Sequence, residues 1–216
     1  MLKRLRLVAI MSILLLSFSA TSSAHEMYYS GSAPNWAPIP LKWSITNFGA
    51  AHLKFNNDSL SSSYTNHYVN ATNAWSNSTS KVQTTRTTFS YSNVDILTPT
   101  NDFWEQKVGF VNVYSVYGIT DITTTDNILI KDSNSAINST RLIKYGHIYM
   151  NPHSQVFGSE NDKLYTMVHE IGHVLGLGHP NSIFYPVNDD SIMRQGSYSS
   201  YTTPRAHDIN DISNKY

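Results

Sequence analysis

The spacing of apolar residues divides the chain into strand-like and helix-like stretches. In residues 41–47 apolar side chains occupy every second position, at Leu41, Trp43 and Ile45, which is the period of a half-buried strand. Residues 59–79 change to a helical period, with Ser59 as the expected N-cap. The apolar stripe of that helix consists of Leu60, Tyr64, Tyr68, Ala71 and Trp75.

Residues 82–152 have the composition of short strands. β-Branched and aromatic residues dominate 82–97, 108–118 and 127–130, with Asn, Asp, Gly and Thr between them, which favours several strands joined by turns. A further strand is expected at 144–152, where Pro152 ends it. Its two faces carry Tyr145, His147 and Tyr149 on one side, and Ile148 and Met150 on the other.

A second helix is expected from about residue 159, with Ser159 or Asn161 as its N-cap. Gly176 is expected to end it, and Pro180 prevents it from resuming. The core-facing stripe of this helix consists of Leu164, Val168, Ile171 and Leu175. The order strand, helix, several strands, helix predicts an α+β fold in which helices cover one sheet.

The first 24 residues are typical of a signal peptide. The start "MLKRLR" is basic, the stretch "LVAIMSILLLSFSA" is apolar, and small residues lead to an expected cleavage after Ala24. A retained membrane anchor is the alternative, but about fourteen apolar residues fall short of the roughly twenty that a spanning helix needs. We therefore expect a secreted, extracellular protein with no stable membrane anchor. Residues 25–40 would form an extended lead-in, and residues 41–216 a single domain.

Charge and cysteine content exclude several classes of protein. Lys and Arg total 15, as do Asp and Glu, so no net charge attracts nucleic acid or an anionic membrane. The 216 residues include no cysteine. Disulfides, cysteine-ligated metal sites and thiol nucleophiles are therefore impossible.

The stretch "HEIGHVLGLGH" carries the candidate chemistry. His169 and His173 are four residues apart, so they lie on one face of a helix and can bind one ion. Gly176 can adopt the left-handed conformation that bends the chain and brings His179 to the same ion. Three imidazoles leave a fourth position open on one Zn²⁺ per chain. Glu170 lies beside the ion, where it can take a proton from a water that the metal activates.

The alternative is that these histidines are ordinary polar residues with no metal-binding role. A HExxH pair alone arises by chance in unrelated helices, and a histidine on a helix face is commonly just a hydrogen-bonded side chain. Gly176 and His179 add two further matches at fixed positions. The complete pattern therefore favours a metal site.

With these residues in place, the sequence resembles the metzincin metallopeptidases, whose signature HExxHxxGxxH it matches from His169 to His179. The stretch "SIMRQG" resembles the methionine turn of that family. Met193 would lie as an apolar base beneath the ligands, with a plain core side chain as the alternative. The resemblance implies a zinc metallopeptidase catalytic domain over residues 41–216.

Within the metzincins the chain is most similar to bacterial matrixins. This resemblance implies a mixed twisted sheet, an edge strand above the cleft, two long helices behind the sheet and a C-terminal helix. "HIYMN" resembles the edge strand and residues 201–216 the closing helix. Pro180 is more typical of serralysins, but Gln195 stands where that subfamily has tyrosine. Residues 181–190 are expected to form an extra loop.

The resemblance implies an endopeptidase that acts as a monomer on extended polypeptides, with Glu170 as general base. The substrate would pair with the strand at 145–151, and residues 194–202 would form the wall of the main pocket. Tyr198 is either an oxyanion-stabilising residue or a surface tyrosine. A second class of function is a secreted zinc-binding adhesion module, and a third is a structural metalloprotein.

Additional metal sites are less well defined. Matrixins usually carry a second, structural zinc, but His147 lacks recognisable acidic partners for one. A structural Ca²⁺ is more plausible, because hard oxygen ligands occur around Asp121, Asp126 and Asp132. A solvated loop is the alternative.

Overall fold

The computed structural model describes residues 25–27, 29–30, 39–46, 49–130, 142–180, 190–194 and 200–216. Its main sheet follows the order β6-β5-β7-β10-β8-β9, and β4 pairs with the first two residues of β10. Strands β8 and β9 are antiparallel to their neighbours, while the other pairs are parallel. The strands are β4 (Lys42–Trp43), β5 (Ala51–Asn56), β6 (Val82–Arg86), β7 (Val94–Leu97), β8 (Gly118–Thr124), β9 (Leu129–Ile130) and β10 (Leu142–Met150).

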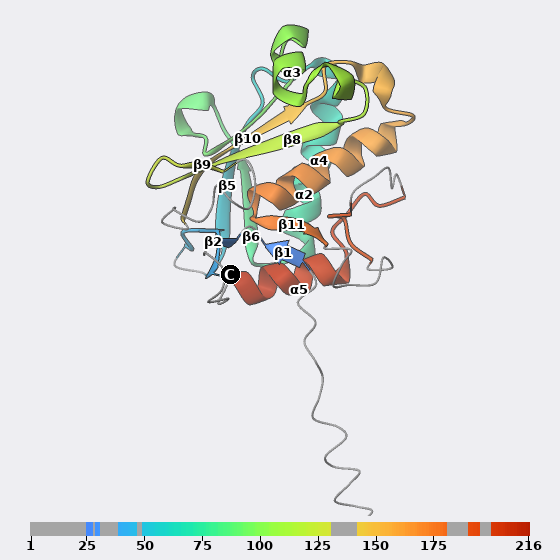
Figure 1. The fold of residues 1–216 in the computed structure, drawn as a ribbon. Helices are drawn as coiled ribbons and strands as arrows, with labels where there is room; N and C mark the ends of the chain where they lie inside the picture. Colours follow the sequence, from blue (N-terminus) through green and yellow to red (C-terminus); the bar gives the residue numbers. More distant parts are fainter. Residues whose placement is uncertain are drawn as a thin grey trace, which may run out of the picture.

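Four α-helices accompany the sheet in the described part of the chain. Helices α2 and α4 pack against each other behind the sheet, α3 lies at its far end, and α5 closes the base (Figure 1). None of the described helices is long and apolar enough to cross a membrane. The helices are α2 (Thr65–Ser78), α3 (Asn101–Val108), α4 (Glu160–Val174) and α5 (Ala206–Lys215). Short 3-10 helices lie at Ser62–Tyr64, Phe89–Tyr91, Phe110–Asn112 and Ser154–Val156.

Three short strands from residues 25–40 pair outside the main sheet. Strand β1 (His25–Met27) pairs antiparallel with β11 (Leu177–Pro180), which follows α4. Strands β2 (Tyr29–Ser30) and β3 (Ile39–Pro40) pair with each other. The expected signal peptide, residues 1–24, lies outside the described residues.

The core lies between the sheet and the two long helices. The predicted stripe of α2 is buried at Tyr68, Ala71 and Trp75, and the indole Nε1 of Trp75 donates to the carbonyl of Val168 on α4 at 2.9 Å. Burial of these aromatic side chains supplies much of the hydrophobic stabilisation that joins the helices. The predicted fold class, α+β with helices covering one mixed sheet, is confirmed.

Several predicted boundaries in the first third are wrong. The strand expected at 41–47 is reduced to two residues, and Ile45 is 51% exposed because only an isolated bridge to Ala51 follows β4. Strand β5, with Leu53 and Phe55 buried, was not predicted. Ser59 does not cap a helix, since α2 begins six residues later and has no side-chain cap.

The strand expected at 108–118 is also wrong. Helix α3 occupies the preceding residues, starting at the Thr100 side chain, which accepts from the backbone N–H of Phe103. A 3-10 turn follows, in which Phe110 and Val111 are 81% and 89% exposed. Val113 is buried while Phe110, Val111 and Tyr114 face solvent, so the stretch does not alternate as a strand does, and β8 begins only at Gly118.

The strand expected at 144–152 is present as β10, but it is not an edge strand. Ile148 and Met150 face the core and Tyr149 lies on the opposite face, as predicted. However, β10 pairs with β7 on one side and with β8 on the other. Strand β8 lies nearer the edge, because β9 pairs only with its residues Ile122 and Thr123.

Candidate metal centre

Helix α4 presents the first two candidate ligands from a buried helix face. Its N-terminus is capped by Ser159, whose hydroxyl accepts from the backbone N–H of Asp162 at 3.2 Å. One helical turn separates His169 from His173, and both side chains are buried. The imidazoles are therefore fixed by a rigid element instead of a loop.

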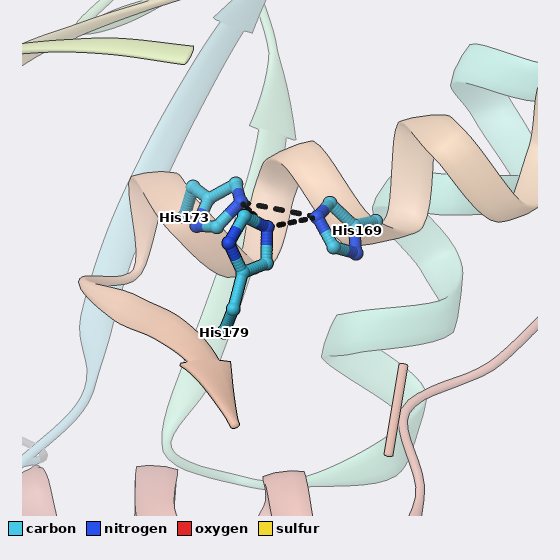
Figure 2. A group of neighbouring side chains, drawn as sticks. All are labelled: His169, His173 and His179. Atoms are coloured by element: carbon cyan, nitrogen blue, oxygen red, sulfur yellow. Dashed lines mark hydrogen bonds between the residues drawn. The ribbon is translucent and has the colours of Figure 1, made fainter. Parts of the chain in front are cut away.

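The third candidate ligand is brought in by a sharp turn. Gly176 has φ +80° and allows the chain to leave α4 and reverse into β11. The Nε2 atoms of His169, His173 and His179 then lie 3.1 Å from one another in all three pairs. Figure 2 shows the three rings, two from α4 and one from β11, converging on one point.

Backbone acceptors orient the two helix-borne rings. The Nδ1 atom of His169 lies 2.8 Å from the carbonyl oxygen of Ile192, and Nδ1 of His173 lies 2.8 Å from that of Leu177. A carbonyl only accepts, so Nδ1 carries the proton in each ring and Nε2 of the neutral ring carries a lone pair. Burial lowers the pKa of His169 to about 3 and lowers the pKa of His173 well below its ordinary value. Both rings are neutral at physiological pH.

Converging lone pairs fit a zinc ion. Tetrahedral coordination at zinc–nitrogen distances of about 2.0–2.1 Å places nitrogen ligands about 3.3 Å apart, close to the separations seen here. Without a cation the lone pairs would repel one another. Among the described residues, these three histidines are the only group of three or more His, Asp or Glu side chains gathered closely enough to hold a metal ion. The donor set therefore suits one zinc with an open fourth position.

Glu170 lies next to the histidines in a tight enclosure formed by β8. The hydroxyl of Thr120 donates to Glu170 Oε2 at 2.7 Å and lies 3.1 Å from the Glu170 carbonyl oxygen. A Cβ added to Gly118 would come within 2.9 Å of both Cγ and Oε1 of Glu170. Burial raises the pKa of Glu170 to about 7, opposed by the hydrogen bond from Thr120. The carboxyl group is thus held in one orientation and poised to exchange a proton near neutral pH.

Met193 packs against α4 at Gly172, the residue before His173. Its side chain is fully buried, and a Cβ added to Gly172 would stand 2.2 Å from Met193 Sδ. The preceding turn is braced from α5, because the Asp208 carboxylate accepts from Ser191 Oγ at 2.7 Å and from the Ile192 N–H at 2.9 Å. This turn also supplies the carbonyl that orients His169.

Part of the expected cleft lies outside the described residues. Residues 181–189 of the expected loop and residues 195–199 of the expected pocket wall are outside the described part of the chain. The second range includes Gln195 and Tyr198. Asp132, one of the proposed calcium ligands, is also outside the described residues. Of the other two calcium candidates, Asp121 forms an ion pair with Lys107 at 2.5 Å and Asp126 accepts from the hydroxyl of Thr124.

His147 has acidic neighbours that the sequence did not reveal. It pairs in register with Asp95 on β7 and with Asp121 on β8, so the three residues form a row across the sheet. Both carboxylates are already engaged: Asp95 accepts from the hydroxyls of Ser92 and Tyr145, and Asp121 is bound by Lys107. This row has the residue types of a metal site but not its convergence.

The surroundings of the candidate ligands were not foreseen from the sequence. Thr120 and Gly118 lie about 50 residues from Glu170, and Asp208 lies 16 residues from the Ile192 N–H that it holds. The β-branched run of β8 could have indicated a strand, but its position against Glu170 depends on the sheet topology.

Comparisons with known proteins give a remote structural likeness. No protein-family model matches the chain, and no curated protein sequence matches it. The chain is similar in structure to high choriolytic enzyme 1, a hatching enzyme zinc-protease from the medaka fish Oryzias latipes. The match covers 80% of this chain and 92% of that chain, with 14% sequence identity and a TM-score of 0.45. A likeness this remote does not carry an activity from one chain to the other, so function has to be argued from the side chains.

Proposed function

We propose that this protein is a zinc-dependent endopeptidase of the metzincin type, secreted and most similar to matrixins. One observation carries the proposal: three imidazole Nε2 atoms, 3.1 Å apart, converge beside a buried glutamate. Open three-histidine coordination is typical of catalytic zinc. The matched signature from His169 to His179 and the signal-like residues 1–24 support the finer assignment.

Glu170 would act as general base and then as general acid. A zinc ion bound by the three histidines would polarise the scissile carbonyl and lower the pKa of a water molecule. Glu170 accepts the proton of that water while the water oxygen attacks the carbonyl carbon, and it then delivers the proton to the departing amine. The hydroxyl of Thr120 keeps Oε2 fixed during this exchange, which leaves Oε1 to handle the proton.

The substrate would pair with β8 instead of with residues 145–151. Among the described residues, Gly118–Asp121 pair only with β10, so their outer edge is open for backbone hydrogen bonds. These residues include the two that enclose Glu170. An extended peptide added to this edge would therefore run past the carboxyl group and the metal ligands.

An adhesion module with the same fold would need the zinc but not the glutamate. Here Glu170 is buried, held by Thr120 and enclosed by Gly118. Burial of a carboxyl group costs stability, and a module that only binds zinc would gain nothing from that cost. This enclosure supports the enzyme over the adhesion module.

Glu170→Gln tests the proposal on a protein substrate. We expect casein hydrolysis to fall about 10²–10⁴-fold, the usual contribution of general acid–base catalysis, while the zinc content stays unchanged. Glu160→Gln, at an exposed position on the same helix, is the matched control and should retain full activity. Chelation should abolish hydrolysis and zinc should restore it. Equal hydrolysis by wild type and Glu170→Gln would rule out the proposed mechanism.

Thr120→Val tests the orientation of the carboxyl group. This variant keeps the shape of the side chain but removes the hydrogen bond to Oε2. We expect kcat to fall about tenfold with KM little changed, because one hydrogen bond to a charged group contributes about 1.5–3 kcal/mol. Thr120→Ser should recover most of the loss. A variant with unaltered kcat would show that Thr120 does not orient Glu170.

A further inference from the structure

The turn between the second and third histidines has an unusual set of hydrogen-bond donors. The last carbonyl groups of a helix normally lack intrahelical partners and are satisfied by water or by a local cap. Here the carbonyls of residues 173–177 each have a donor from the protein. The donors, in chain order of the acceptor, are Gly176 N, Trp43 Nε1, Tyr216 Oη, Lys215 Nζ and His173 Nδ1.

Three of these donors come from distant parts of the chain. Trp43 of β4 donates to Val174 at 2.9 Å, Tyr216 donates to Leu175 at 3.0 Å, and Lys215 of α5 donates to Gly176 at 2.8 Å. Residues 171–178 are buried throughout. Side chains have therefore replaced solvent at a helix end where solvent is the usual partner.

Burial of Lys215 beneath this turn costs folding free energy. Lys215 is only 6% exposed, and a buried ammonium is costly unless it is paired. Asp211, one helical turn earlier on α5, is also buried and is 3% exposed. A Cβ on Gly176 would lie 2.5 Å from the backbone oxygen of Leu41 and 2.2 Å from Lys215 Nζ, so a glycine here lets the lysine approach the turn closely. The turn and the lysine are thus mutually adapted.

The same turn determines where His179 lies. Only Leu177 and Gly178 lie between Gly176 and His179, and the Nδ1 atom of His173 donates to the carbonyl of Leu177 within the turn. A displacement of the turn would therefore move one ligand and release the orienting acceptor of another. Restraining a site in its binding conformation before the ligand arrives raises affinity, because less freedom is lost on binding.

We propose that Trp43, Lys215 and Tyr216 are positioning residues for the metal centre, acting through the carbonyls of residues 174–176. This inference rests on the proposed function, since it presumes that the histidines bind zinc. None of the three touches the metal or the substrate. Their effect is on zinc affinity, through the position of His179.

Tyr216→Phe tests the inference with a matched control. Tyr64→Phe removes an equivalent buried hydrogen bond, from Tyr64 Oη to the carbonyl of Asn151 at 2.7 Å, away from the metal turn. The zinc dissociation constant of each folded variant is measured by competition with a fluorescent chelator. We expect affinity to fall about tenfold in Tyr216→Phe, at the lower end of the 10–100-fold cost of removing outer partners of a metal site. Tyr64→Phe should bind zinc as wild type does.

Lys215→Met provides a second, independent variant. It keeps an unbranched side chain against Gly176 but removes the donor to its carbonyl, and we expect a similar loss of zinc affinity. If Tyr216→Phe and Lys215→Met bind zinc as tightly as Tyr64→Phe does, the inference is overturned while the proposed function stands. If the wild-type protein itself binds no zinc, both are overturned.

Discussion

Helices α3 and α4 both end beside a glycine with positive φ, but in opposite surroundings. Gly109 is the C-cap of α3, with φ +79°, and Gly176 follows Leu175, the C-cap of α4, with φ +80°. A Cβ on Gly109 would meet nothing within 4 Å, whereas one on Gly176 would lie 2.5 Å from the carbonyl oxygen of Leu41. The first turn leads into exposed Phe110, and the second leads into the strand that carries His179.

The difference between the two turns separates two requirements. The glycine ends the helix, whereas contacts with other elements fix where the next residues lie. A glycine is sufficient to stop a helix and reverse the chain. Holding the following residue at a defined place requires donors from other elements, which α4 has in Trp43, Lys215 and Tyr216. Only the turn that is held in this way can present a ligand at a fixed distance from two others.

The largest effect is expected from an added methyl group at each turn. Gly176→Ala should cost about 4 kcal/mol or more, because unfavourable left-handed backbone adds to overlap with a backbone oxygen. Gly109→Ala should cost about 1–3 kcal/mol, from the backbone conformation alone. Chemical denaturation of both variants measures the difference. Equal losses of stability would mean that the two turns are not embedded differently.

A smaller effect is expected from pH, through Lys215. Burial lowers the pKa of Lys215 to about 7, partly opposed by the Asp211 carboxylate and reinforced by Lys42. Because the folded state gives up this proton at a lower pH than the unfolded state does, its stability rises as pH increases from about 7 to about 10. Below pH 7 the charged lysine imposes its full cost.

Lys215→Met removes this titration and so reveals its sign. Relative to wild type, the variant should be most stable near pH 6 and should lose that advantage, by a few kcal/mol at most, as pH rises to 10. Melting temperatures across this range measure the trend, with exposed Lys144→Met as the control. A constant difference between wild type and Lys215→Met would contradict burial of the lysine beneath the turn.

The smallest effect is expected at the opposite ends of the same two helices. Thr100 and Ser159 both cap with side-chain oxygens, which accept from Phe103 N and Asp162 N at 3.3 and 3.2 Å. Thr100→Ala and Ser159→Ala should each cost about 1 kcal/mol by thermal denaturation. If the two variants lose similar amounts of stability, α3 and α4 differ only at their C-terminal ends. A much larger loss of stability in Ser159→Ala would show that the N-terminal ends differ as well.

The sequence is sufficient to predict that His169 and His173 lie together, because they are local. His169, Glu170, His173 and Gly176 belong to one helix and its end, where spacing alone places side chains on one face. Local spacing also predicts the cap at Ser159 and the buried helical stripe that includes Trp75. Each depends on residues within a few positions, which is the range over which periodicity is informative.

The sequence does not predict which strand lies nearest the edge or what surrounds the ligands. Tyr145, His147 and Tyr149 give β10 a polar face that resembles an exposed strand, yet Asp95 and Asp121 from its two neighbours flank that face. Alternation reports the two faces of a strand and not its neighbours in the sheet. Strand order is a property of the long-range topology.

Elemental analysis of the purified protein shows whether His169, His173 and His179 hold a zinc ion. We expect one zinc per chain in wild type and none in His179→Asn. The zinc content of His147→Asn should be unchanged, because the carboxylates that flank His147 are already occupied. A wild-type protein without zinc, or a His179→Asn variant that retains it, would contradict the account.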